Sequence, residues 1–292
     1  MRFFWLACHA MADDPLEALD GRTPLEIAKK PFMDELAREA RLGTAAWIPA
    51  SLNASGEVAA YSMLGYDPRE FYTGLAPLEA MSCRAITDDR SVVFRCDLVT
   101  VSEGELSDPR AGGISQEEAA VLTADLNKKI QKFHARIVPM RGYKNLLFVD
   151  VAQKADQLDD VETVSPERLR NEKIAKWLPK GKAGVFLRDL MEASCEVLEN
   201  HEVNRVRIDL KENPASMIWL WGQGKKPKLP PFRQRAGFEN CLWSQSDAWQ
   251  GLALSAGIPL MKEWNESEFL DLNIAAWQTE EADHSKDHRA KV

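Results

Sequence analysis

The sequence has 292 residues, of which 45% are hydrophobic and 28% are charged, with a formal net charge of −8 and a pI of about 5.3. This composition is typical of a globular protein, and the length suits one large domain or two ordinary ones. The acidic balance argues against broad nucleic-acid binding, and no apolar run approaches the roughly 18–20 residues of a membrane span. We therefore expect neither nucleic acid nor a membrane as a partner.

The first element that we expect is a buried strand at residues 2–7, RFFWLA. A signal peptide is the alternative, but the apolar run is short, ends at His9 and is followed by acidic residues. The five cysteines are odd in number and form no CxxC pair, which indicates reduced thiols in a cytoplasmic protein.

Helical spacing of apolar residues then predicts a helix over residues 23–43, with Gly43 as its C-terminal stop. Residues 45–50 are a candidate second strand. Residues 92–101 alternate in the manner of a half-buried strand. Ser115 and Glu118 have the spacing of a capping box that opens a helix to Ile130.

The remaining expected elements complete an alternating pattern. We expect a strand at 146–151 and a charged, irregular surface stretch at 152–182. An amphipathic helix should follow at 184–200, with Leu187, Leu190, Met191, Ser194 and Val197 inward. Further strands are expected at 218–221, 240–245 and 258–264, with a short helix from Ser246 or Asp247 to Ala256. The chain after 265 is polar and is expected to be a frayed tail. Alternating strands and helices predict the α/β class.

Several stretches together resemble one protein family. They include MADDPLEALDGRTPLEIAKKP (11–31), EVAAYSMLGYDPREFYTG (57–74), PLEAMSCRA (77–85), VVFRCDLVTV (92–101), GGISQEEA (112–119) and NRVRIDLKENPASMIWLWGQGKKPKLPPF (204–232). In this order along roughly residues 1–264, they resemble the archaeal-type, 2,3-bisphosphoglycerate-independent phosphoglycerate mutases of the alkaline phosphatase superfamily.

The resemblance implies an alkaline-phosphatase-like α/β core with a second α/β domain inserted into it. Residues 1–78 would form the first part of the core, 79–235 the inserted domain, 236–264 the return to the core, and 265–292 a polar tail. It also implies phosphoryl transfer between the 3- and 2-positions of glycerate, through a phosphoserine intermediate between two divalent metals, manganese or magnesium.

The catalytic loops depart from the family pattern. His9 stands where the family has its first metal-binding Asp, and Gly56 stands where it has the nucleophilic serine. A one-residue slip would bring Ser55 to that position, although we prefer Ser55 as part of a surface turn. His9 and Glu57 are the candidates for a residual one-metal site, and we expect metal binding to be weak or absent.

Family members also continue past the end of this sequence, with further Asp and His metal ligands. Here His284 and His288 lie in the tail with helical spacing. We prefer a solvated tail over a metal site for this pair. A sheet that lacks later strands would have an open edge, so we expect self-association or a partner chain that covers the core.

The inserted domain keeps the residues that, by resemblance, bind phosphoglycerate. These are Arg95, Asn204, Arg205 and Arg207, with Lys144 in place of an Arg, whereas the family's His is Gly113 here. A guanidinium binds phosphate or carboxylate in a bidentate manner. The alternative role for such arginines is surface solvation and ion pairing.

We therefore predict a catalytically impaired relative of phosphoglycerate mutase. It would retain binding of a phosphorylated small acid such as phosphoglycerate and act as an interaction or regulatory protein. The alternative is a phosphoglycerate mutase or related phosphotransferase, active alone or with a second chain that supplies the missing metal ligands.

Overall fold

The computed structural model describes residues 5–8, 11–86, 91–150, 158, 161–238 and 240–261, with Lys182 described by its backbone alone. Contacts divide the chain into two units, Met1–Trp47 with Lys262–Val292, and Ile48–Met261. The domain boundaries that the resemblance implies, at 78 and 235, differ from this division and stay a prediction. The expected tail, with His284 and His288, lies outside the described residues.

The first unit contains short helices and no buried side chain among its described residues. Its elements are η1 (Glu17–Leu19), α1 (Pro24–Ile27) and α2 (Pro31–Glu39). The expected single helix over 23–43 is wrong, because Pro31 lacks an N–H and disfavours helical geometry at the residue before it. Lys30 accordingly has φ −137° and ψ 57°.

The strands expected in this part of the chain are not found in its described residues. Residues 5–7 and 45–50 belong to no strand, and residues 2–4 lie outside the described part. A single extended segment is stable only when a neighbouring strand pairs with it. Instead, the rings of Trp5 and Trp47 lie 6.2 Å apart.

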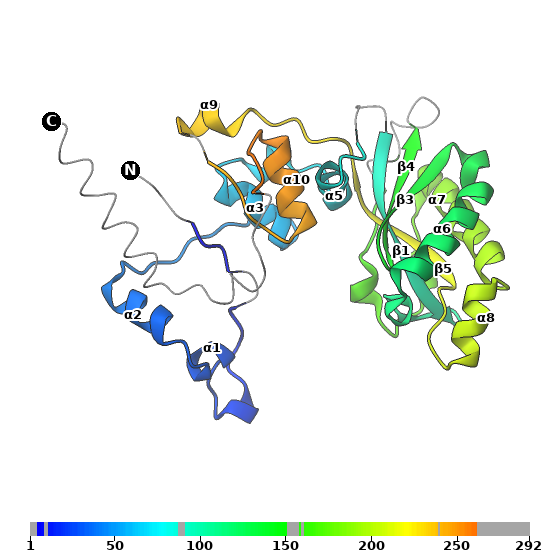
Figure 1. Ribbon diagram of the computed structural model, residues 1–292, viewed down its shortest axis with the longest axis horizontal. Helices are drawn as coiled ribbons and strands as arrows, with labels where there is room; N and C mark the ends of the chain where they lie inside the picture. Colours follow the sequence, from blue (N-terminus) through cyan, green and yellow to red (C-terminus); the bar gives the residue numbers. More distant parts are fainter. Residues whose placement is uncertain are drawn as a thin grey trace. The chain divides into compact units, whose positions relative to one another are not determined.

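The second unit combines a five-stranded antiparallel sheet with helices on both faces (Figure 1). In chain order its elements are α3 (Gly56–Met63), α4 (Pro68–Phe71), α5 (Leu75–Ser82), β1 (Ser91–Ser102), β2 (Glu105–Asp108), η2 (Ala111–Gly113), α6 (Gln116–Ile130), η3 (Gln131–Phe133), β3 (Ala135–Arg141), β4 (Lys144–Asp150), η6 (Pro166–Leu169), η7 (Ile174–Lys176), α7 (Gly181–Leu198), α8 (Glu202–Asp209), β5 (Met217–Gly224), α9 (Phe232–Ala236) and α10 (Asp247–Ser255). The mixed α/β class is confirmed.

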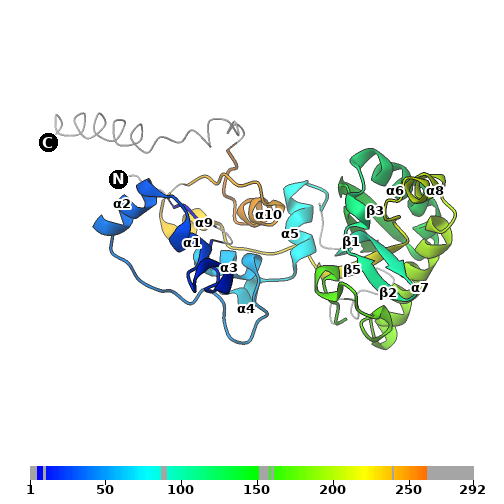
Figure 2. The same ribbon diagram turned by 90° about the horizontal axis from the view of Figure 1, so that it is seen from below.

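Strand β1 is the centre of the sheet, since it pairs with β2, β4 and β5. Its residues Val92 to Thr100 are all buried. The expected strand is therefore confirmed, but its expected half-buried pattern is wrong. Helices α6 and α7 cover one face of the sheet and α5 covers the other (Figures 1 and 2), so both sets of alternating side chains are buried.

Other expected elements on the sheet side are confirmed with small changes of boundary. Ser115 and Glu118 form the capping box of α6. Strand β4 begins at Lys144, and β5 extends the expected strand to Gly224. Helix α7 begins three residues before the expected start, and Leu187, Leu190 and Met191 are buried. The expected irregular stretch at 152–182 contains η6 and η7 in its described part, where Leu169 and Ile174 are buried.

The chain returns to α5 after the sheet. Helix α10 begins at Asp247, close to the expected start, and contacts α5. A side chain at Gly251 would place its Cβ 1.7 Å from the carbonyl oxygen of Leu78, so only glycine allows this packing. The expected strands at 240–245 and 258–264 are wrong within the described residues, where Leu242 and Leu260 form an isolated parallel bridge.

The WGQG end of β5 lies backbone to backbone against the residues before α5. A Cβ at Gly224 would lie 1.8 Å from the carbonyl oxygen of Thr73, and the hydroxyl of Thr73 donates to the carbonyl of Lys225 at 2.7 Å. Gln223 accepts a hydrogen bond from Thr163 at 2.7 Å. The glycines of this motif therefore serve close packing of the chain. No helix in the described part of the chain is long and apolar enough to cross a membrane.

Candidate functional site

A buried ionic cluster lies between α5 and the sheet. We call Glu79, Arg95, Asp97 and Trp221 the Arg95 cluster. Arg95 Nη1 donates to both carboxylate oxygens of Glu79, at 2.8 and 3.0 Å. Its Nε and Nη2 donate to Asp97 Oδ1, at 3.2 and 2.6 Å. Arg95, Glu79 and Asp97 are only 3%, 5% and 2% exposed.

The indole of Trp221 completes this cluster. Its Nε1 donates to Asp97 Oδ2 at 2.7 Å, and the Arg95 guanidinium lies 5.2 Å from the centre of its ring. Arg95 and Trp221 are register partners on β1 and β5, which places both side chains on the same face. Each of the three guanidinium nitrogens therefore donates to a carboxylate, and Arg95 has a structural role here.

The two carboxylates have different environments. Burial raises the pKa of Glu79 from 4.5 to about 7, against the effect of the Arg95 charge. Burial also raises the pKa of Asp97, which is opposed by Arg95 and by the hydrogen bond from Trp221. Asp97 thus accepts from three donor nitrogens, whereas Glu79 accepts from Nη1 alone.

A second buried arginine holds α8 against the start of α6. Arg207 Nη1 donates to both oxygens of Glu118, at 3.0 and 2.9 Å, and lies 3.1 Å from Glu212. Its Nη2 and Nε donate to the carbonyl oxygens of Ala111 and Asn213, at 2.9 and 3.0 Å. We call Arg207 and these four partners the Arg207 cluster. All three guanidinium nitrogens therefore have partners within the fold.

The side chain of Asn204 also bonds to groups within the fold. It is 1% exposed, its Nδ2 donates to the carbonyls of Leu198 and Ala215, and its Oδ1 accepts from the amide of Ala215. Helix α8 therefore has two polar side chains, Asn204 and Arg207, directed inward. The assignment of Arg95, Asn204 and Arg207 to ligand binding stays a prediction, and their contacts explain their presence without a ligand.

Lys144 and Arg205 differ from these three. Arg205 is exposed on α8, and Lys144 is partly buried at the start of β4, opposite Asp97. The Lys144 ammonium lies 6.0 Å from the centre of the Tyr143 ring. No ion pair among the described residues uses either cation, and no described contact brings the two together. Their assignment to ligand binding is likewise a prediction.

The loop that resembles the nucleophile region begins α3. Ser55 is the N-cap residue, and its hydroxyl oxygen accepts from the amide of Val58 at 3.4 Å. Gly56 is the first helical residue. The Tyr72 hydroxyl donates to Glu57 Oε1 at 3.2 Å, and the Tyr72 ring packs edge-on against Tyr61. Ser55 thus acts as a half-buried helix cap, and its assignment as a nucleophile stays a prediction.

The described residues do not form a metal site. Within the described ranges, no three His, Cys, Asp or Glu side chains come together in a group that could hold an ion. Glu57 contributes one carboxylate, already hydrogen-bonded to Tyr72. His9, the other candidate ligand, lies outside the described residues.

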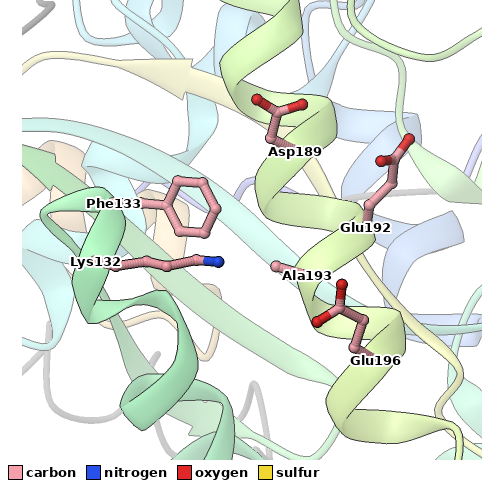
Figure 3. A pocket seen from close by; sticks show the side chains of 6 residues that line it. All are labelled: Lys132, Phe133, Asp189, Glu192, Ala193 and Glu196. Carbon is pink, nitrogen blue, oxygen red and sulfur yellow. The ribbon is translucent and has the colours of Figure 1, made fainter.

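A surface hollow of about 440 Å³ opens between η3 and α7 (Figure 3). Lys132 and Phe133 face three acidic side chains of α7 across it, Asp189, Glu192 and Glu196. Glu196 also pairs with Lys129 at 2.6 Å. None of the residues that we expected in a site lines this hollow.

The family model for 2,3-bisphosphoglycerate-independent phosphoglycerate mutase matches residues 37–204. A phosphoglycerate mutase of this type from Methanothrix thermoacetophila is 38% identical over 275 residues, which are 94% of this chain and 68% of the relative. The chain belongs to the 2,3-bisphosphoglycerate-independent phosphoglycerate mutase family.

A second relative and two solved structures are also similar to this chain. The mutase of this name from Methanosarcina barkeri is also 38% identical, over 94% of this chain and 68% of its own length. A protein of known structure from Pyrococcus horikoshii superposes with a TM-score of 0.62 at 24% identity, covering 86% of this chain and 59% of that one. The cofactor-independent phosphoglycerate mutase of Thermoplasma acidophilum gives a TM-score of 0.50 at 21% identity, covering 88% and 68%. The fold class expected from the resemblance is thus confirmed.

Two residues of the Arg95 cluster were not singled out from the sequence, Glu79 and Asp97. A signal for Asp97 was present, since Arg95 and Asp97 are two apart in an otherwise apolar strand and must share a face. No local signal points to Glu79, because its contact with Arg95 joins a helix to a strand.

Proposed function

We propose that this phosphoglycerate mutase family protein is non-catalytic and works by binding, as an interaction or regulatory protein. One observation carries the proposal. Gly56 occupies the position that resembles the nucleophile, and the hydroxyl of the adjacent Ser55 caps α3. A serine nucleophile needs a hydroxyl free to attack and a base or metal that activates it.

The test is a mutase assay of the purified protein with manganese and 3-phosphoglycerate. We expect no turnover above background for the wild type, for Ser55→Ala or for Gly56→Ala. Turnover by the wild type that Ser55→Ala abolishes would overturn the proposal and assign Ser55 as the nucleophile. Turnover that survives both substitutions would overturn it as well and exclude a mechanism based on either position.

A second candidate is a mutase that is active alone or with a second chain that supplies metal ligands. It is favoured by the names of the relatives, which are 38% identical over 94% of this chain and are phosphoglycerate mutases. The same assay, repeated with the part of the Methanothrix relative that has no counterpart here, separates the two. Manganese-dependent turnover only in the mixture would support this second function.

We further propose that the binding function includes a phosphorylated small acid such as phosphoglycerate. Lys144 and Arg205 support this, because the ion pairs of the described residues leave both cations unused. Arg95 and Arg207 already donate to carboxylates within the fold, so they would position such a site without contacting its ligand.

Calorimetry with 3-phosphoglycerate tests this binding. We expect Lys144→Ala or Arg205→Ala to weaken binding about tenfold or more, since a charge-assisted contact contributes roughly 1.5–3 kcal/mol. Lys128→Ala is the matched control, because Lys128 is an exposed lysine paired with Asp125 on α6. Binding that neither substitution weakens, or no binding by the wild type, would contradict the proposal.

Association with a second copy of the chain is the last part of the proposal. Helix α2 has three exposed apolar side chains, Phe32, Met33 and Leu36, at 52%, 42% and 53%. Exposed apolar groups of this kind favour association. Light scattering across a range of concentrations should show a dimer that Phe32→Ser with Leu36→Ser dissociates. A monomer at every concentration would contradict self-association and leave a different partner chain as the occupant.

A further inference from the structure

The Arg95 cluster has more negative than positive charge in a space that excludes water. Two carboxylates, Glu79 and Asp97, share one guanidinium, and all three side chains are at most 7% exposed. A buried charge without full compensation has a high free energy, and protein groups avoid this by changing their protonation state. The cluster therefore favours uptake of one proton.

The hydrogen bonds decide which carboxylate takes the proton. Asp97 accepts from Arg95 Nε and Nη2 and from Trp221 Nε1, so its charged form is well solvated by the protein. Both oxygens of Glu79 accept from the single nitrogen Nη1. Because fewer donors stabilise its charged form, Glu79 is the group that protonates first.

Other charged groups surround Glu79 without changing this ordering. Four charged groups affect the pKa of Glu79: Arg95 and Asp97 on β1, Lys144 on β4 and Asp247 on α10. Glu79 in turn raises the pKa of Tyr72, before α5, and of Cys83, at the end of α5. Asp247 is itself paired with Arg141 at 2.6 Å. Lys144 opposes protonation and Asp247 favours it, so they act in opposite directions.

Glu79 also has a position from which protonation affects packing. It lies on α5, which contacts α10 on one side and β1 and β5 on the other. Its carboxyl oxygens accept hydrogen bonds from Arg95 that join α5 to β1. Loss of one proton from Glu79 adds a buried negative charge directly in this contact.

We propose that Glu79 and Arg95 form a proton-linked latch, in which a protonated Glu79 holds α5 tightly on the sheet and its ionisation loosens that contact. The direction follows from linkage. A group whose pKa is higher in the folded state stabilises the fold below its unfolded pKa, and this stability is lost as the pH rises through the folded value. For Glu79 the interval lies between its ordinary pKa of 4.5 and about 7.

The first test uses hydrogen–deuterium exchange of the α5 amides, Leu75–Ser82, between pH 5.5 and 8.5. After correction for intrinsic rates, we expect protection in the wild type to fall at least tenfold with a midpoint near pH 7. Glu79→Gln has nearly the same shape and cannot ionise, so its protection should be independent of pH. Equal pH dependence in both proteins would overturn the latch.

Asp97→Asn is the control for the neighbouring carboxylate. We expect the midpoint to shift to lower pH in this variant, because Glu79 then has Arg95 to itself. An unchanged midpoint would show that Glu79 does not share the guanidinium, and would overturn the proposal.

A second measurement needs no variant and holds even if Glu79→Gln fails to fold. The wild type is labelled with ¹³C at the glutamate side-chain carboxyls and titrated by NMR. Exposed glutamates titrate near their ordinary pKa of about 4.3. One glutamate resonance with a midpoint near pH 7 is expected, and no resonance that titrates above pH 6 would overturn the latch.

Discussion

The Arg95 cluster and the Arg207 cluster are both built around a buried arginine, but they differ in what surrounds the partners. Arg95 faces two carboxylates whose side chains are 7% and 2% exposed. The carboxylates of Arg207, on Glu118 and Glu212, are 30% and 50% exposed, and two backbone carbonyls take its remaining donors. The carboxylates of the first cluster are almost fully shielded from water, whereas those of the second are partly exposed to it.

This difference bears on what an arginine that resembles a ligand contact can mean in a member of this family. An arginine retained for a ligand should have donors to spare. In both of these, every guanidinium nitrogen already donates to a partner within the described residues, because each arginine joins segments far apart in the sequence. Arg95 joins α5 to β1, and Arg207 joins α8 to the loop before α6. The presence of Arg95 and Arg207 in the sequence is therefore explained by their contacts within the fold.

The largest expected effect is that of Arg95→Leu. It leaves Glu79 and Asp97 buried without a counter-charge, and breaking a buried ion pair in this way costs about 3–5 kcal/mol. Urea unfolding followed by circular dichroism measures the loss. Arg136→Leu, an exposed arginine on β3, is the matched control and should cost less than about 1 kcal/mol. A loss at Arg95 no larger than at Arg136 would show that water reaches the cluster.

Arg207→Leu should have a smaller effect, about 2–3 kcal/mol, since its carboxylate partners can turn to solvent while two carbonyls lose their donors. The same unfolding assay applies. An effect equal to that of Arg95→Leu would remove the distinction between a dry cluster and one open to water.

The parts of the fold that could be predicted are those with a local cause. The capping box at Ser115 and Glu118 acts within one turn of helix, and the apolar run of β1 marks a strand wherever it lies. Pro31 was also a local signal, and its effect on the residue before it explains the interruption between α1 and α2.

What could not be predicted depends on pairing across the chain. The burial of both faces of β1 requires α5 on one side and α6 and α7 on the other, which the alternation of its residues does not reveal. Likewise, Arg207 resembled a ligand contact because its donors are visible in the sequence, but Ala111, Asn213 and Glu118 become its partners only in the folded chain. The sequence motif alone does not distinguish an arginine that contacts a ligand from one that stabilises the fold.

Glu118→Gln should cost about 1 kcal/mol, because a neutral amide keeps one bond to Arg207 but weakens the capping box with Ser115. Burial works to raise the pKa of Glu118, but the hydrogen bonds from Ser115 and Arg207 outweigh it and the pKa lies below its ordinary value. Stability from this carboxylate is present above its unfolded pKa and is lost as the pH falls through the folded one.

The pH dependence of the stability of Glu118→Gln distinguishes the Arg207 cluster further from the Arg95 cluster. The difference between wild type and Glu118→Gln in urea unfolding should shrink between pH 5 and pH 3, whereas the Glu79 contribution changes near neutral pH and in the opposite direction. A difference that is constant over the acidic range would contradict the lowered pKa of Glu118.

Arg205→Ala is expected to have the smallest effect on stability, within about 0.5 kcal/mol, because Arg205 is exposed on the outer side of α8. Arg205 and Arg207 are two residues apart on the same helix, so the two variants compare an exposed arginine with a buried one that stabilises the fold. The same unfolding assay measures it, with Arg207→Leu as the comparison. A loss above 1 kcal/mol would mean that Arg205 has a partner that stabilises α8, which would argue against its proposed contact with a phosphorylated ligand.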